Sequence, residues 1–314
     1  MLVTKLYFPP ARAARVNRPR LVERLETGLR GPLTLIAAPA GYGKTTLMAE
    51  WRASGGDGMP AAWISLDAGD NDLITFLRYI TAALDTLEDG LTASTSLLLQ
   101  SEQPLPATSL LTALVNDVDR YPTEFVLALD DCHVITDAEI YAGLDFLIQN
   151  APQKMHLVLL SRSDPALPLA RLRARGQMVE IRAEHLRFTR DEAAQFLAQV
   201  MDLELTPEQV SALETRSEGW IVGLHMAALS MQGRSREGLA DFVDEFTGSH
   251  RYIMDYLVGD VLVNQPEAIR VFLLKTSILE RLSAWLCQAV TGVSIPGLNV
   301  GPRGALYPCL CGWR

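Results

Sequence analysis

The segment at residues 33–46, LTLIAAPAGYGKTT, constrains the fold of this chain more than any other feature. An apolar run leads into a loop of small residues that ends in Gly43, Lys44 and Thr45. Small residues let backbone N–H groups converge on a phosphate, a helix N-terminus adds partial positive charge, and the lysine and threonine suit the outer phosphates and Mg²⁺. The first glycine of the usual pattern is Ala38 here, which packs closely but adopts a positive φ only at a cost. The segment predicts a phosphate-binding loop; a glycine-rich turn before an ordinary lysine is the alternative.

A second motif, FVLALDD at residues 125–131, ends an apolar run in two carboxylates. Such a run is typical of a buried parallel strand whose C-terminal end carries acidic groups into a site. Next to a phosphate loop, Asp130 is expected to hold Mg²⁺, and Asp131 to orient or deprotonate an attacking water. The alternative is a strand that ends in a turn where the carboxylates cap backbone N–H groups. The two motifs together predict nucleoside triphosphate binding.

Composition narrows the class of protein. With 314 residues the chain can form one large domain or several modest ones, and 48% hydrophobic residues allow a sizeable core. The net charge of −9 argues against a chain that binds nucleic acid mainly through electrostatics. Few cysteines and no signal peptide indicate a cytoplasmic location, and no apolar run approaches the length of a membrane helix. Prolines 9, 10 and 19 disfavour a helix over the first twenty residues.

Alternating strand and helix patterns predict an α/β fold, a P-loop NTPase with a parallel sheet covered on both faces. The expected strands are 33–38, 61–66, 125–130, 156–161 and 177–181, and the expected helices are 44–53, 73–87, 109–120, 137–149 and 167–174. The strand at 61–66 comes, in sequence, between the strand before the phosphate loop and the strand that ends in Asp130. This order favours the additional-strand division of these ATPases. In that division a polar sensor often follows the next strand. Arg162 is placed there and could contact the γ-phosphate, whereas an ordinary loop arginine is the alternative.

After residue 184 the pattern becomes helical. Thr189 with Glu192 predicts a capping box, and Thr206 begins another helix. Residues 219–231 (GWIVGLHMAALSM) predict a buried helix, and 252–264 and 267–276 predict two more. Residues 293–314 have neither helical nor strand periodicity.

The motifs together resemble the signal-transduction (STAND) ATPases of the MalT-like, large LuxR-type bacterial transcriptional regulators. The blocks that carry the resemblance are APAGYGKTTL, SLDAGDND, LALDDCH, LVLLSRSDPALPLARLRARGQ, LRFT, RSEGWIVGLHMAALS, GSHRYIMDYL and FLLKTSILERL. The resemblance implies an adenine-side segment (1–30), a P-loop ATPase domain (31–184), a helical domain (185–240) and a partial winged-helix domain (241–292). It also implies that 293–314 is a non-native gene end and that the helical-repeat sensor and helix-turn-helix are missing.

The resemblance also implies site residues. The adenine side would be lined by Val16 and Arg18, and Asp130, Asp131 and Arg162 would serve as magnesium ligand, catalytic acid and sensor. The nucleotide would contact the phosphate-loop residues Ala40, Gly41, Tyr42, Gly43, Lys44, Thr45 and Thr46, with Thr45 also on the metal. Trp220 stands where related ATPases contact the nucleotide through a Gly-x-Pro motif. The proline is missing here, so apolar stacking is the only nucleotide contact expected. An ordinary core residue is the favoured interpretation of Trp220. No role can be assigned to His250 and Arg251.

Two clusters of charged residues are better explained by a structural role than by ligand binding. Asp67, Asp70 and Asp72 lack the glycine and distal glutamate of a calcium loop, so we expect them to cap the helix at 73. Three arginines of one helix, at positions 171, 173 and 175, could form an arginine finger or a nucleic-acid patch, but a solvated helix face is favoured.

The sequence therefore predicts an ATP/ADP-binding switch module that requires Mg²⁺ and hydrolyses ATP slowly. By the resemblance, ADP holds the domains closed, while ATP and a small-molecule or protein inducer favour an open, self-associating form. DNA would be bound only through a C-terminal domain outside this chain. The alternatives are a P-loop turnover enzyme, such as a small-molecule kinase, and a non-functional gene fragment.

Overall fold

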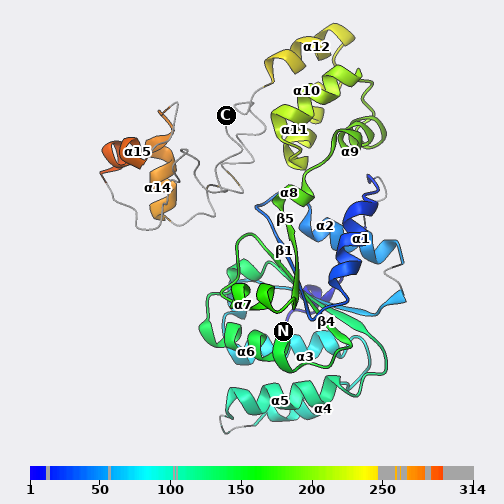
Figure 1. Ribbon diagram of the computed structural model, residues 1–314, viewed down its shortest axis with the longest axis vertical. Helices are drawn as coiled ribbons and strands as arrows, with labels where there is room; N and C mark the ends of the chain where they lie inside the picture. The colour runs from blue at the N-terminus through cyan, green and yellow to red at the C-terminus, as the bar shows by residue number, and fades with distance from the viewer. Residues whose placement is uncertain are drawn as a thin grey trace. The chain divides into compact units, whose positions relative to one another are not determined.

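A parallel β-sheet organises the first of the two units into which the chain divides, Met1–Leu186. The second unit is Arg187–Arg314, and its described elements are helices. The computed structural model describes residues 1–11, 15–55, 58–101, 103, 105–246, 259, 262, 267–279 and 284–292. Figure 1 labels the elements of both units.

The sheet has five strands in the order β2-β3-β4-β1-β5, and every neighbouring pair is parallel. The strands are β1 (Leu33–Ala37), β2 (Ala61–Ser65), β3 (Phe125–Asp130), β4 (Met155–Ser161) and β5 (Met178–Arg182). All five were predicted to within one residue at each end. The additional-strand class is confirmed, but the strand that separates β1 from β3 in space is β4. The strand at 61–66, which suggested that class, forms an edge of the sheet.

Eight helices of the first unit are described. They are α1 (Pro19–Gly28), α2 (Lys44–Ala53), α3 (Leu73–Leu84), α4 (Ala93–Leu98), α5 (Ala107–Val118), α6 (Ala138–Asn150), α7 (Leu169–Ala174) and α8 (Ala183–Leu186). The bounds of α2 are those predicted, whereas the other predicted helices begin or end up to three residues away. Three helices, α1, α4 and α8, were missed. Pro19 occupies the first turn of α1, where its missing N–H and fixed φ are compatible with a helix.

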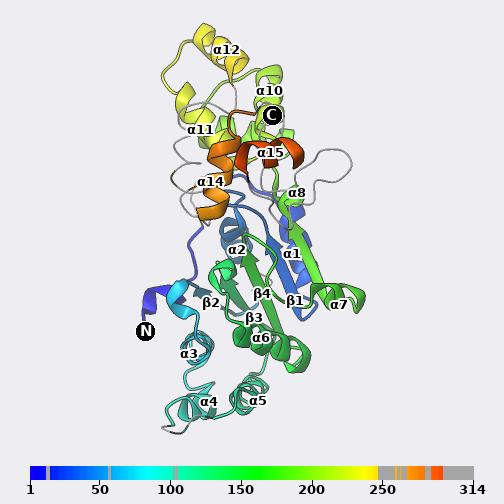
Figure 2. The same cartoon turned by 90° about the vertical axis from the view of Figure 1, so that its left-hand side faces the viewer.

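Helices cover both faces of the sheet, as predicted (Figure 1, Figure 2). Residues of α3, α5, α6 and α7 pack on one face, against Leu35, Leu127 and Leu159. Residues of α1 and α2 pack on the other face, where Trp51 and Trp63 are fully buried. Strands β1, β3 and β4 are buried along their whole length, which explains their continuous apolar sequences.

The N-terminal residues lie along the edge strand β2. The 3-10 turn η1 (Val3–Leu6) contacts β2, and the Phe8 ring lies 4.9 Å from the Trp63 ring. The Lys5 Nζ atom donates to Asp70 Oδ2 at 2.7 Å, and the Tyr79 hydroxyl accepts from the Leu2 N–H at 3.0 Å. These contacts fix the start of the chain to the sheet.

Two helices of the second unit begin at the predicted caps, Thr189 and Thr206. The unit contains α9 (Arg190–Gln195), a π-helical turn η5 (Phe196–Val200), α10 (Pro207–Ser217), α11 (Ile221–Met231), α12 (Arg236–Glu245), α14 (Glu267–Thr276) and α15 (Ala284–Thr291). The capping box of Thr189 with Glu192 is confirmed, and Thr206 forms a second box with Gln209. The π turn continues α9, where a plain helix was expected.

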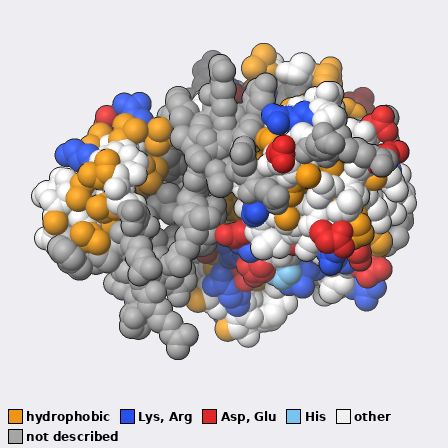
Figure 3. All heavy atoms as spheres, turned by 90° about the horizontal axis from the view of Figure 1, so that it is seen from above, with side chains coloured by type: hydrophobic (Ala, Val, Ile, Leu, Met, Phe, Trp, Pro, Cys, Tyr) orange, Lys and Arg blue, Asp and Glu red, His pale blue; other side chains and the backbone are white. Residues whose placement is uncertain are grey.

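Other predictions for this unit fall partly outside the described residues. They include most of the helix at 252–264, the role of His250 and Arg251, and the irregular segment 293–314. The helix predicted at 267–276 is confirmed as α14, and several apolar side chains on and just after it are exposed (Figure 3): Ile269, Val271, Leu274 and Ile278. Within the described part of the chain, no helix is both long and apolar enough to cross a membrane.

Gly219 fixes a close backbone contact in the second unit. Its φ is +66°, and a Cβ atom there would lie 2.5 Å from the carbonyl oxygen of Phe188. The Phe188 N–H also donates to the Gly219 carbonyl at 2.8 Å. The segment before α9 and the start of α11 therefore meet at a position that only glycine can occupy.

We expect Gly219→Ala to destabilise this unit by about 2–4 kcal/mol, because it adds a backbone clash to an unfavourable φ. Gly233→Ala is the matched control: its φ is +76°, but no atom lies within 4 Å of the added Cβ. The control should cost only about 1 kcal/mol. Chemical denaturation followed by circular dichroism measures both, and equal losses would contradict the contact.

Candidate functional site

The predicted phosphate loop connects β1 to α2 and has the backbone that its glycines require. Gly41 and Gly43 have φ of 77° and 78°, values that side chains other than hydrogen rarely tolerate. Ala38 is buried and is not among the described residues with positive φ. Its N–H donates to the Ser161 carbonyl at 3.2 Å. Alanine at the first glycine position is therefore compatible with the loop, because this position needs close packing and no left-handed backbone.

Lys44 is the first residue of α2, and its side chain lies inside the loop. Its Nζ atom donates to the carbonyls of Ala38 at 2.9 Å and Pro39 at 3.1 Å. Burial lowers the pKa of Lys44 to about 8, and the Arg162 charge acts in the same direction, while Asp130 and Asp131 oppose it. The loop therefore holds a cation among backbone carbonyls, next to two carboxylates.

Thr45 and Asp130 meet at the ends of different elements. The Thr45 hydroxyl donates to Asp130 Oδ2 at 2.7 Å, and the other carboxylate oxygen accepts the Asp131 N–H at 2.9 Å. Burial raises the pKa of Asp130, although the hydrogen bond from Thr45 counters the effect. A hydroxyl and a carboxylate are the oxygen ligands that Mg²⁺ prefers, so this pair fits the predicted metal ligands.

Asp131 lies just beyond β3 in a left-handed conformation with φ of 57°. Such a conformation costs free energy for a residue other than glycine and often marks functional sites. The Asp131 side chain is 45% exposed, whereas that of Asp130 is buried. The structure thus gives the two carboxylates different environments, which agrees with the different roles predicted for them.

Arg162 follows β4 and is half-buried. Its charge lowers the pKa of both Lys44 and His133, so its guanidinium lies near the phosphate loop and the end of β3. Among the described residues, no hydrogen bond or ion pair of Arg162 is present, unlike two arginines of α7. Arg171 pairs with Asp145, and Arg173 pairs with Glu180 on β5. These pairs agree with the interpretation of α7 as a helix with a solvated charged face. Arg162, in contrast, lies beside the phosphate loop.

The two adenine-side residues lie at the start of α1. Val16 and Arg18 are both about 4% exposed. An Arg18 guanidinium nitrogen donates to the Leu186 carbonyl at 2.5 Å, and Arg20 donates to the next carbonyl back, that of His185. The structure therefore uses the Arg18 side chain to hold the end of α8. Adenine contacts by Val16 and Arg18 stay predictions.

Trp220 belongs to the second unit, where it precedes α11. It is half-buried, and its Cε3 atom lies 3.0 Å from the position that a Cβ on Gly223 would take. The ring thus packs over a glycine of its own helix, as a core residue would. Its nucleotide contact also stays a prediction.

The acidic cluster before α3 has the predicted capping role. Asp72 accepts from the Thr75 N–H at 2.8 Å, and Asp67 with Asp70 forms a capping box on the 3-10 turn η3 (Ala68–Asp70). The sequence did not reveal the partner of this cluster, Lys5, which forms ion pairs with Asp67 and Asp70 at 2.7 Å.

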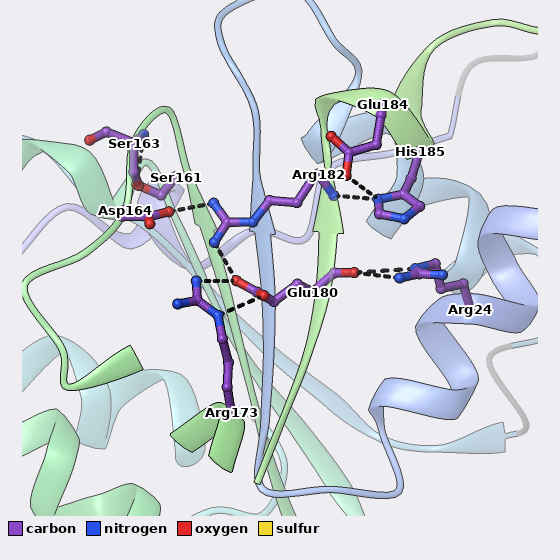
Figure 4. A network of polar contacts seen from close by, with 9 residues as sticks. All are labelled: Arg24, Ser161, Ser163, Asp164, Arg173, Glu180, Arg182, Glu184 and His185. Carbon is purple, nitrogen blue, oxygen red and sulfur yellow. Dashed lines mark hydrogen bonds and ion pairs between the residues drawn. The ribbon is translucent and has the colours of Figure 1, made fainter. Parts of the chain in front are cut away.

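Sequence reasoning missed two features of the site. The first is His133, which follows the two acids in the LALDDCH block and lies beside Asp131. The second is a charge network where β4 and β5 end (Figure 4). In it, Arg182 pairs with both Asp164 and Glu180. The only signal for the network was a run of arginines and acids in the segments 162–164 and 173–182.

Glu180 is the centre of this network. It accepts two hydrogen bonds from Arg173, each of 2.9 Å, and pairs with Arg182 (Figure 4). The hydrogen bonds from Arg173, supported by Arg182, lower the pKa of Glu180 to about 2. The loop that carries Arg162 is tied to β5 through Asp164 and Arg182, so the network fixes the position of that loop.

Comparison with known structures defines the class of fold. A signal-transduction ATPase with a tetratricopeptide-repeat sensor from Pyrococcus horikoshii matches 91% of this chain and 38% of its own, with a TM-score of 0.53 and 14% identity. A Walker-type ATPase from Pyrococcus abyssi matches 93% of this chain and 89% of its own, with a TM-score of 0.52 and 16% identity. The chain has the fold of the P-loop STAND ATPases.

Comparison of sequences identifies a more specific relative. The chain is 35% identical over 296 residues to the HTH-type transcriptional regulator MalT of Cronobacter sakazakii, a match that covers 93% of this chain and 32% of that protein. Residues 258–296 match the MalT winged helix domain. The chain is therefore similar over most of its length to a MalT-type regulator, as the sequence blocks predicted, and it spans about a third of the length of this relative.

The Glu180 network makes a prediction for stability against pH. Because the pKa of Glu180 is about 2 in the folded protein and 4.5 ordinarily, its stabilising contribution is complete above pH 4.5 and is lost as the pH falls towards 2. Glu180→Gln should lower the free energy of unfolding by about 1–2 kcal/mol at pH 7, a value reduced for partial exposure. The deficit should shrink below pH 4.5.

Urea unfolding at several pH values from 7 down to about 2.5 measures the deficit across the range in which it should shrink. Glu184→Gln is the control, because that side chain is 73% exposed. A deficit for Glu180→Gln that does not change with pH would mean that packing, and not charge, holds this network.

Proposed function

We propose that this chain binds ATP or ADP with Mg²⁺ at the β1–α2 loop and hydrolyses ATP slowly, as the switch module of a MalT-type transcriptional regulator. The observation that carries the proposal is the hydrogen bond between Thr45 and Asp130, 2.7 Å long, beside a loop with two left-handed glycines and a buried lysine. This combination brings a hydroxyl, a carboxylate and a cation together at one helix N-terminus, which suits a magnesium-bound phosphate chain.

Each residue has a distinct part in the proposed reaction. Lys44 would exchange the carbonyls of Ala38 and Pro39 for phosphate oxygens, while Thr45 and Asp130 would hold Mg²⁺, which neutralises phosphate charge when bound. Asp131 would orient the water and accept its proton. The water oxygen bonds to the γ-phosphorus as the bond from phosphorus to the bridging oxygen breaks. Arg162 would stabilise the charge on the γ-phosphate oxygens.

The regulatory part of the proposal follows from homology. The relative is named as a transcriptional regulator of the helix-turn-helix type. We propose that the nucleotide state of this chain sets a closed or an open form, and that a small-molecule or protein inducer and self-association act on the same equilibrium. Because the net charge is −9, DNA recognition is assigned to a helix-turn-helix domain and not to these residues. A cytoplasmic location follows from this role.

Nucleotide binding is tested by Lys44→Ala. Removal of the cation should weaken ATP and ADP binding by at least about tenfold, the worth of one charged hydrogen bond or more. Calorimetric titration of each nucleotide in the presence of Mg²⁺ measures the change. Lys154→Ala, a surface lysine of the same unit beside Asp119, is the control and should bind as the wild type does. Equal affinities of Lys44→Ala and wild type would refute the site.

Substitution of the two carboxylates should have different effects on nucleotide affinity and on hydrolysis. Asp131→Asn should leave nucleotide affinity nearly intact but reduce hydrolysis by roughly 10²–10⁴-fold, the usual contribution of a general base. Asp130→Asn should weaken magnesium-nucleotide binding as well, because the Thr45 partner and metal ligand is changed. Single-turnover hydrolysis and direct titration distinguish the two. If both variants lost affinity equally, the roles assigned to the pair would be wrong.

A further inference from the structure

His133 lies beside Asp131 in a position that suits a specific task. Its Nδ1 atom is 3.6 Å from Asp131 Oδ1, and the histidine side chain is 21% exposed. The Nδ1 atom itself is buried and has no hydrogen-bond partner among the described residues. A buried polar nitrogen without a partner is costly, so its presence next to an acid of the site requires an explanation.

We propose that His133 is a positioning residue that holds the Asp131 carboxylate towards the attacking water by donating the Nδ1 hydrogen to it. The inference rests on the proposed hydrolysis of ATP. It assigns to this chain a site residue that neither the motif analysis nor the homology identified.

The two acids differ in what fixes them. Both oxygens of Asp130 are engaged, one by the Thr45 hydroxyl and one by the Asp131 N–H. In contrast, the Asp131 carboxylate is 45% exposed, and no hydrogen bond to it is present in the described part of the chain; the nearest ring nitrogen is that of His133. Catalytic hydrogen bonds are often long without substrate and tighten in the reactive complex. The gap of 3.6 Å requires a shift of less than 1 Å to become such a bond.

The surroundings favour the neutral imidazole. Burial lowers the pKa of His133, and the nearby charges of Arg162 and Lys44 act in the same direction, while Asp131 opposes them. A neutral imidazole carries one N–H, and the partner of each nitrogen decides where the hydrogen resides. Asp131 is the acceptor beside Nδ1, so the hydrogen is expected on that nitrogen.

The test compares two amides that mimic different ring nitrogens. In His133→Asn the side-chain N–H group falls near the position of Nδ1, and in His133→Gln it falls near Nε2. Single-turnover ATP hydrolysis should drop about 10–100-fold in His133→Gln and His133→Ala, the usual loss for a residue that orients a catalytic group. His133→Asn should recover most of the rate. Nucleotide affinity should stay within about twofold of wild type in all three, since none binds the phosphates.

A double-mutant cycle tests the coupling directly. In the Asp131→Asn background, His133→Gln should cause almost no further loss of hydrolysis, because the group that it orients is already disabled. His185→Gln is the control, because this histidine also lies beside a carboxylate, that of Glu184, but on α8. It should hydrolyse ATP as the wild type does.

The possible outcomes distinguish a failure of the proposed ATP hydrolysis from a failure of the role given to His133. If the wild type bound no nucleotide, the proposed function and this inference with it would fail. If the wild type hydrolysed ATP and His133→Gln did so equally fast, only the role of His133 would be overturned. Equal losses in His133→Asn and His133→Gln, or losses that add to that of Asp131→Asn, would show that His133 only supports the local structure.

Discussion

The parallel pairing of β1 with β4 is the constraint on which the site depends. In its register Ala37 lies opposite Ser161, so the phosphate loop and the Arg162 loop leave the sheet side by side. On the other side of β4, Leu129 pairs with Leu159, which brings Asp130 to the same edge. The carboxyl ends of parallel strands meet at one edge, and ligands bind outside that edge in open α/β sheets. A shift of one residue in either pairing would separate the cation from the acids.

Burial then sets the electrostatics of this edge. It lowers the pKa of Lys44 and raises that of Asp130, and in both cases the opposite charge nearby works against the shift. Closeness of the two charges, together with the hydrogen bond from Thr45 to Asp130, therefore favours the ionised forms against the effect of burial.

The sequence predicted the parts of this structure that depend on local pattern. Strand positions, the loop and the capping boxes follow from periodicity and from residue types at fixed spacing. Helix α4 was missed because its serines and threonines are weak helix formers, and its support is tertiary: the buried Asp117 accepts from the Thr95 N–H and hydroxyl. The partners of Arg18 and Lys5 were missed for a related reason, because each contact joins the side chain to a residue that only the assembled fold brings near. His133 lies only two residues from Asp131, and its approach to that carboxylate depends on the turn after β3.

The N-terminal residues along β2 have a consequence for solubility. An edge strand offers unpaired backbone groups to any other chain, and proteins must protect such edges to avoid aggregation. Here the two edges are protected differently, since β5 carries charged Glu180 and Arg182, whereas β2 is apolar and lies against the turn at Val3–Leu6 and the ring of Phe8. A variant shortened by its first eight residues would keep every proposed catalytic group and yet expose a template for intermolecular strand pairing.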